Sequence, residues 1–86
     1  MNESIEAHEV ILGVDTHLDV HVAVLIDAVG RVVAKHSVPT TAIGYDHLIE
    51  WASSFGRLKR AGVEGTGTYG AALARRMREC GLEVIE

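Results

Sequence analysis

Two acidic residues, Asp15 and Glu64, end apolar segments at places where a carboxylate could take part in chemistry. Asp15 follows the run EVILGV, and Glu64 follows KRAGV and precedes a glycine-rich stretch. A buried carboxylate is costly unless it binds a metal ion or accepts hydrogen bonds. Taken alone, each residue is better explained as an ordinary acid at a strand end, beside a turn.

The pair is more informative than either residue. If the two segments are neighbouring parallel strands, both carboxylates lie at the same edge of the sheet. Two carboxylates that close repel each other, unless a divalent cation lies between them or one is protonated. Oxygen ligands suit Mg²⁺ or Mn²⁺, and a two-metal site stabilises the attacking and leaving oxygens of phosphoryl transfer. We therefore expect Asp15 and Glu64 to bind Mg²⁺ or Mn²⁺ weakly, and we regard Asp19 and Asp27 as turn residues.

The first half of the chain predicts three strands. Residues 9–14 are an apolar run that is typical of a buried strand, and 20–26 and 31–38 are rich in β-branched residues. Residues 27–30, DAVG, have the length and the glycine of a hairpin turn. These strands are expected to form an antiparallel meander.

A helix is predicted after the third strand. Pro39 ends that strand, and Thr40 or Thr41 can cap a helix N-terminus with its hydroxyl. Gly56 is expected at the C′ position that follows the helix. Apolar residues at positions i, i+3, i+4 and i+7 predict its buried stripe, namely Leu48, Trp51, Ala52 and Phe55.

A strand, a second helix and a further strand complete the predicted α/β fold. Residues 59–64 predict the fourth strand and 82–85 the fifth, and Gly81 is expected to end the helix between them. The order β-β-β-α-β-α-β implies a mixed sheet in which the fourth strand runs parallel to an earlier one. The predicted buried face of this helix consists of Tyr69, Ala72, Leu73, Met77 and Cys80.

Size and charge restrict the function. A chain of 86 residues is one domain or less, and its net charge of −4 argues against a free-standing nucleic-acid binder. The charge is uneven, because residues 1–50 sum to −6 and residues 51–86 to +2. The second part contains two basic clusters, which we interpret as solvated rather than as a phosphate-facing edge. They are Arg57, Lys59 and Arg60, and Arg75, Arg76 and Arg78.

Nothing in the sequence predicts secretion or membrane insertion. No apolar run approaches the ~20 residues of a membrane span, and residues 1–9, MNESIEAHE, are acidic and polar, unlike a signal peptide. We expect residues 1–8 to be a disordered tail. The single cysteine, Cys80, allows no intrachain disulfide, which fits a reducing cytoplasm.

Several other residues have ordinary explanations. His17 and His21 have the i, i+4 spacing of a helical zinc pair, but the spacing spans a turn and a strand, so we expect solvated or strand-lining roles. Cys80 is expected to be a small core residue near a helix end. Tyr69 and Trp51 fit core stripes better than a base-stacking platform.

Longer motifs resemble a known family. Gly13-Val14-Asp15, the meander, and above all the segment GVEGTGTYG at 62–70 followed by ALARRMRECGLEV resemble the N-terminal domain of the DEDD transposases. These are the insertion-sequence-110, or Piv-like, transposases, whose first domain is RuvC-like with a ribonuclease-H-like fold. The resemblance covers the chain from about residue 9.

The resemblance implies a function in DNA transposition in the bacterial cytoplasm. The family's first Asp matches Asp15 and its Glu matches Glu64, which implies that both bind a divalent metal. Its two later aspartates and its C-terminal domain have no counterpart among these 86 residues. We therefore expect residues 9–86 to form a partial ribonuclease-H-like domain that is inactive alone. The resemblance also implies a structured guide RNA and a homo-oligomer.

A dinucleotide-binding (Rossmann-like) module is the first alternative. Gly65-Thr66-Gly67-Thr68-Tyr69-Gly70 is a literal G-x-G-x-x-G between a strand and a helix, and Glu86 follows Gly65 by 21 residues, near where such a fold places its ribose-binding acid. However, Glu64 would repel the pyrophosphate. The three-stranded meander is also foreign to that fold.

Two further alternatives remain. An actin-like sugar kinase or ATPase shares the Gly-Val-Asp strand and the meander, but it needs a glycine-rich phosphate turn where this chain has Thr16-His17-Leu18-Asp19. The chain could also be a truncated, non-catalytic remnant that folds without cutting DNA.

Overall fold

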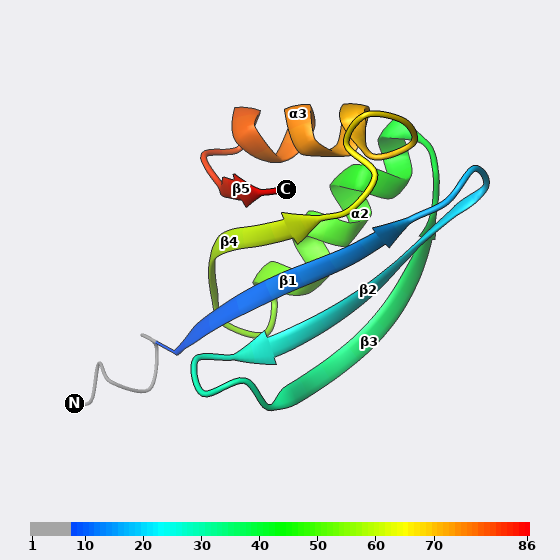
Figure 1. Cartoon of the computed structure of the whole chain (residues 1–86). Coiled ribbons are helices and arrows are strands. Elements are labelled where there is room, and N and C mark those ends of the chain that lie inside the picture. Colours follow the sequence, from blue (N-terminus) through cyan, green and yellow to red (C-terminus); the bar gives the residue numbers. More distant parts are fainter. Residues whose placement is uncertain (1–7) are drawn as a thin grey trace.

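A computed structural model describes residues 8–86, which form one mixed sheet with two helices against it (Figure 1). The elements follow the predicted order β-β-β-α-β-α-β. The predicted tail at residues 1–8 lies, except for His8, outside the described residues. The elements are β1 (Glu9–Thr16), β2 (Val20–Asp27), β3 (Val32–Pro39), α2 (Ala42–Ser53), β4 (Arg57–Val63), α3 (Ala71–Glu79) and β5 (Glu83–Ile85).

The strand order across the sheet is β3-β2-β1-β4-β5. The three hairpin-linked strands pair antiparallel, and β4 and β5 join the other side of β1 in parallel. The predicted parallel pairing of the fourth strand is therefore confirmed, and its partner is the first strand. This arrangement brings the carboxyl ends of β1 and β4 together at one edge.

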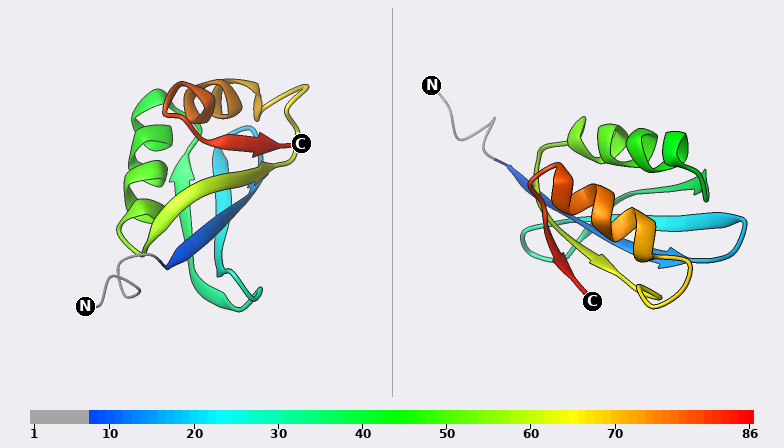
Figure 2. Two further views of the ribbon diagram at one scale, coloured as in Figure 1. Left: turned by 90° about the vertical axis from the view of Figure 1, so that its left-hand side faces the viewer. Right: turned by 90° about the horizontal axis from the view of Figure 1, so that it is seen from above.

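Both helices cover the same face of the sheet (Figure 2). Strand side chains alternate between the two faces, so Val10, Leu12 and Val14 of β1 are buried, while Gly13 and Asp15 face the other side. Leu48 of α2 and Leu73 and Met77 of α3 are also fully buried. Burying one such side chain contributes about 1.5–3 kcal/mol. The core therefore lies between the helices and one face, and the opposite face stays open.

The start of α2 agrees with the sequence, whereas its end does not. Thr41 is the N-cap, and its hydroxyl accepts a hydrogen bond from the Gly44 amide at 3.0 Å. The helix ends at Ser53, so Phe55 lies beyond it and is 43% exposed. The expectation that Gly56 is the C′ residue is wrong. Gly56 instead allows a close approach, because a Cβ there would lie 2.6 Å from the His8 carbonyl oxygen.

The end of α3 is the capped terminus that the sequence predicts. Gly81 has φ +88°, its amide donates to the Arg78 carbonyl at 2.9 Å, and the Leu82 amide donates to the Met77 carbonyl at 3.0 Å. These two bonds form a Schellman motif. Two predicted members of the buried stripe are wrong, because Tyr69 precedes the helix and Cys80 follows it, and both are exposed.

The predicted hairpin turn between β2 and β3 is confirmed. The Asp27 side chain accepts hydrogen bonds from the Arg31 amide at 2.9 Å and the Val29 amide at 3.1 Å, and Gly30 has φ +90°. The bond from the Arg31 backbone is the main cause that lowers the pKa of Asp27. Among residues 8–86, no helix is both long and apolar enough to cross a membrane.

His21 is fully buried on the helix-covered face of β2. Its ring stacks on that of Tyr45, with centroids 5.6 Å apart, and its Nδ1 lies 3.3 Å from the Thr40 hydroxyl. Because this hydroxyl donates to the His17 carbonyl at 2.9 Å, Nδ1 must carry the proton and donate to Thr40. Nε2 then has no hydrogen-bond partner among the described residues. Burial lowers the pKa of His21 and thereby favours the neutral form of this strand-lining histidine.

We predict that mild acid destabilises the fold through His21. Because its pKa is lowered in the folded state, the unfolded chain takes up the proton first as the pH falls below about 6.5. The free energy of unfolding should be highest above that pH and fall below it, by at most about 1.4 kcal/mol per pH unit. Urea unfolding between about pH 7.5 and 5.5 measures this slope. His21→Phe should flatten it, and the exposed control His8→Gln should not; an unchanged slope in His21→Phe would assign the titration to another group.

Candidate functional site

The backbone places Asp15 and Glu64 at adjacent positions of two parallel strands. Val14 of β1 pairs with Val63 of β4, and the Glu64 amide donates a hydrogen bond to the Val14 carbonyl at 3.0 Å. Neighbouring strands lie about 4.8 Å apart. The two acids, 49 positions apart in the sequence, therefore start from neighbouring backbone positions. We call this place, with Asp15 and Glu64, the acid edge.

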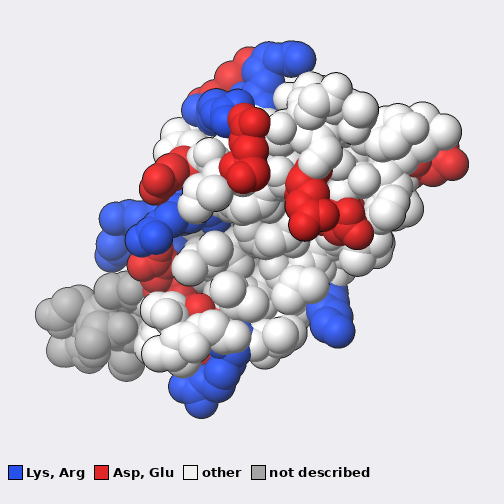
Figure 3. Space-filling model, viewed as in Figure 1, with Lys and Arg blue, Asp and Glu red and all other residues white. Residues whose placement is uncertain are grey.

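Both acidic side chains lie on the open face of the sheet. Val14 and Val63 are buried under the helices, and because side chains alternate along β1, Asp15 faces the other way. Glu64 directly follows β4 and lines the same hollow as Asp15. Asp15 and Glu64 are both exposed. In Figure 3, acidic side chains lie against one another over the carboxyl ends of β1 and β4. The adjacent backbone positions that the sequence predicts for this pair are therefore present.

A surface hollow of about 560 Å³ lies next to the acid edge. Its floor contains Gly13 and Gly62, which pair across β1 and β4. The nearest atoms to a Cβ built on these glycines are 3.8 and 3.9 Å away, so neither position is crowded. The hollow is lined by Gly13, Val14, Asp15, Val22, Val24, Gly62, Val63, Glu64, Ile85 and Glu86.

His17 is part of the acid edge, although sequence reasoning did not assign it there. Its Nε2 lies 3.2 Å from the Asp15 carboxylate, and the two side chains are 53% and 60% exposed. A contact this exposed contributes little to stability. It places a ring nitrogen of His17 beside the Asp15 carboxylate. No sequence signal marked this contact, because β1 continues through Thr16, past the point where the turn was expected.

Thr16 holds the backbone that carries Glu64. Its buried hydroxyl donates a hydrogen bond of 2.6 Å to the Glu64 carbonyl, across 48 positions of sequence. Gly65 follows with φ +75°, and a Cβ there would lie 2.6 Å from the Thr16 hydroxyl oxygen. Glycine is required for both reasons, its backbone conformation and the space beside Thr16. Together these two residues fix the direction of the chain as it leaves β4.

The acid edge has too few ligands for a complete metal site. Within the part of the chain that the structure describes, no three His, Cys, Asp or Glu side chains form a group that could hold a metal ion. Glu86 also lines the hollow, but its carboxylate is already bonded to Arg78 and Thr66, at 2.8 Å each. Two exposed carboxylates fit a weak Mg²⁺ or Mn²⁺ site that needs ligands from elsewhere.

Comparison with known protein families shows to which family the chain belongs. A family model of DEDD insertion-sequence-110 transposases, described as "Transposase", matches residues 12–86. The chain belongs to this transposase family. The match includes Asp15, Glu64 and all of the segment GVEGTGTYG at 62–70, as the resemblance predicted. No curated protein matches the chain.

Membership in this transposase family implies interaction with DNA. The match begins within β1 and runs through β5, so both strands of the acid edge lie inside it. In this transposase chain, the acid edge, His17 and the bond between Thr16 and Glu64 form one connected group of residues at the carboxyl ends of two parallel strands.

We predict that Gly65→Ala destabilises the fold far more than Gly67→Ala. Gly65 has a positive φ and its added Cβ would meet the Thr16 hydroxyl, whereas nothing lies within 4 Å of a Cβ at Gly67, whose φ is ordinary. We expect a loss of about 1–2 kcal/mol or more for Gly65→Ala and less than about 0.5 kcal/mol for Gly67→Ala. Urea unfolding of both variants measures this. Equal losses would show that Thr16 and Gly65 do not fix this turn.

Proposed function

We propose that this chain supplies Asp15 and Glu64 as metal ligands in a DNA-processing site of an insertion-sequence transposase. The observation that supports this most directly is the position of both acids. They follow paired, buried valines on neighbouring parallel strands and face the same open side. A family whose substrate is DNA, and an edge that presents two carboxylates, together favour metal-dependent phosphoryl transfer.

The oxygen donors of the acid edge fit Mg²⁺ or Mn²⁺. When bound, such ions neutralise the charge that develops on the attacking and leaving oxygens of a phosphodiester. The chain's own residues present two carboxylates, hold Glu64 through Thr16 and place a ring nitrogen of His17 beside Asp15. The glycine floor of the hollow leaves room for a nucleic-acid backbone beside the acids.

A ribonuclease-H-like domain is the fold that we propose. A meander on one side of β1 and parallel crossovers on the other, with acids at the ends of β1 and β4, support this interpretation. The two remaining acids, the guide RNA, the homo-oligomer and the bacterial cytoplasm stay predictions from the resemblance. Because a two-metal site usually has more than two carboxylates, we propose that residues 8–86 alone are inactive.

We predict weak binding of Mn²⁺ at the acid edge. In an NMR titration, paramagnetic Mn²⁺ should broaden the amide signals of Val14, Asp15 and Glu64 before others. Asp15→Asn and Glu64→Gln should each weaken the effect about tenfold or more, since each removes one of two charged ligands. Asp19→Asn is the matched control, because it removes an exposed acid from the next turn. Broadening that starts elsewhere, or that survives both substitutions, contradicts the proposed site.

We predict that the 86-residue chain does not cut DNA by itself. Duplex and branched DNA incubated with the chain and Mg²⁺ should remain intact on a denaturing gel, because two carboxylates do not complete the site. The control for contaminating nucleases is Asp15→Ala, which should give the same background. Cleavage by the unaltered chain that Asp15→Ala abolishes would overturn the proposed inactivity and would support the proposed metal ligand.

A further inference from the structure

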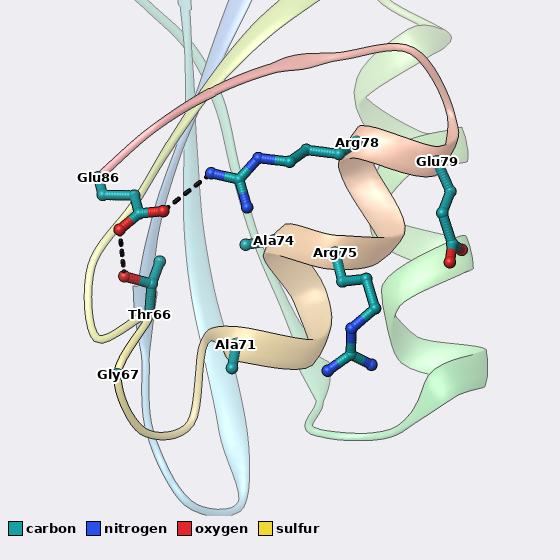
Figure 4. A pocket seen from close by; sticks show the side chains of 8 residues that line it. All are labelled: Thr66, Gly67, Ala71, Ala74, Arg75, Arg78, Glu79 and Glu86. Atoms are coloured by element: carbon teal, nitrogen blue, oxygen red, sulfur yellow. Dashed lines mark hydrogen bonds and ion pairs between the residues drawn. The ribbon is translucent and has the colours of Figure 1, made fainter.

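A second hollow, of about 670 Å³, lies between α3 and the glycine-rich turn that follows β4 (Figure 4). We call it the arginine hollow, because two arginines of α3 line it. Gly67 and two alanines keep it open, since none of them projects a long side chain into it. Its lining consists of Thr66, Gly67, Ala71, Ala74, Arg75, Arg78, Glu79 and Glu86.

An internal carboxylate already occupies one end of the arginine hollow. The two carboxylate oxygens of Glu86 accept one hydrogen bond each, from Arg78 Nη2 and from the Thr66 hydroxyl, both at 2.8 Å (Figure 4). The Arg78 bond, followed by the Thr66 bond, lowers the pKa of Glu86, which keeps this carboxylate ionised. A guanidinium and a hydroxyl that converge on two oxygens of an anion also form a donor set for phosphate.

Arg75 adds a second positive charge to the arginine hollow. It lies one helical turn before Arg78 and lines the same hollow, although its guanidinium points away from Glu86 (Figure 4). Arg75 has no ion pair with any residue of the described range 8–86. Arg76, by contrast, is bonded to Asp46 and Glu79, at 2.6 and 3.4 Å. Of the three arginines at 75, 76 and 78, two are therefore paired with acids, and Arg75 is the one that remains available to attract an external anion.

The arginine hollow adjoins the acid edge. Thr66 follows Glu64 by two residues, and Glu86 lines both hollows. A nucleic-acid strand with one phosphate at the acid edge would therefore have further phosphates near the arginines. Arginine suits this role because its planar donors match phosphate oxygens.

We propose that the arginine hollow binds a backbone phosphate of a nucleic-acid strand, with Arg78 and Thr66 as donors and Arg75 as an additional positive charge in the same hollow. In the free protein the Glu86 carboxylate occupies the phosphate position and leaves when the strand binds. This inference rests on the proposed function, since the strand is the one that reaches Asp15 and Glu64. It differs from the metal site in needing no cation.

The central test is a substitution that removes a negative charge from the arginine hollow. A fluorescently labelled single-stranded DNA of about 12 nucleotides is titrated with the chain in EDTA at low salt, because phosphate contacts are strongest there. Glu86→Gln should increase the affinity about tenfold, because it frees Arg78 and Thr66 for the phosphate. Glu83→Gln is the matched control, since it removes the same charge three residues earlier, outside the hollow, where Glu83 lies 3.9 Å from Arg60. An equal increase in both variants would overturn the proposal.

A second pair of variants tests Arg75. Arg75→Gln should lower the affinity of the Glu86→Gln chain and reduce its salt dependence by about one phosphate contact. Arg57→Gln, an exposed arginine at the start of β4, removes the same charge outside the hollow. Equal losses of DNA affinity from both substitutions would mean that the arginines attract DNA only through diffuse electrostatics, and would overturn the proposed site. Circular dichroism confirms that each variant remains folded.

A titration with inorganic phosphate tests whether the arginine hollow binds an anion at all, separately from whether that anion belongs to a nucleic acid. In an NMR titration of the Glu86→Gln chain, phosphate alone should shift the amide signals of Thr66 and Gly67. If phosphate binds there and the DNA strand does not, the nucleic-acid assignment is wrong. Because these titrations contain EDTA, they report on the arginine hollow even if Asp15 and Glu64 fail to bind Mn²⁺, so the two proposals fail independently.

Discussion

The hydrogen-bonded pairing of β1 with β4 is the constraint on which the rest of this molecule depends. Val14 and Val63 pair, the Glu64 amide bonds to the Val14 carbonyl, and the Thr16 hydroxyl bonds to the Glu64 carbonyl. Because side chains alternate along a strand, a slip of one residue would turn a carboxylate into the core and a valine into water. The burial of apolar side chains therefore holds the acids on one face, although neither acid contributes to the core.

Because both helices cover the same face of the sheet, the two faces differ in composition and in role. The face under α2 and α3 is filled by large apolar side chains, whereas the open face has Gly13 beside Gly62 next to the acids. Glycine in a strand weakens the strand, because it has no side chain to pack. Two of them side by side leave bare backbone, so another chain can approach this part of the sheet closely. The two glycines thus make this part of the sheet less stable but leave the acid edge accessible from the open face.

The sequence was sufficient for the order of the elements and for the parallel pairing that puts Asp15 and Glu64 at adjacent backbone positions, because apolar periodicity and short crossovers restrict the topology strongly. It failed at helix ends, where Phe55, Tyr69 and Cys80 continue a periodic pattern that the backbone no longer follows. It also missed the contact of His17 with Asp15 and the hydroxyl bond of Thr16. The Thr16 bond depends on the register between residues 48 positions apart, which no local pattern contains.

The glycine-rich turn after β4 illustrates why a motif has to be judged by its hydrogen bonds. A dinucleotide site would use free amides of this turn and the start of α3 to hold a pyrophosphate. Here the amides of Thr68 and Gly70 both donate to the Gly65 carbonyl, at 2.9 and 2.8 Å, so these two amides are already used within the turn. The candidate ribose acid, Glu86, is bonded to Thr66 of the same turn. The glycines therefore serve the tight return of the chain behind Glu64, where Gly65 has φ +75° and its carbonyl accepts both bonds.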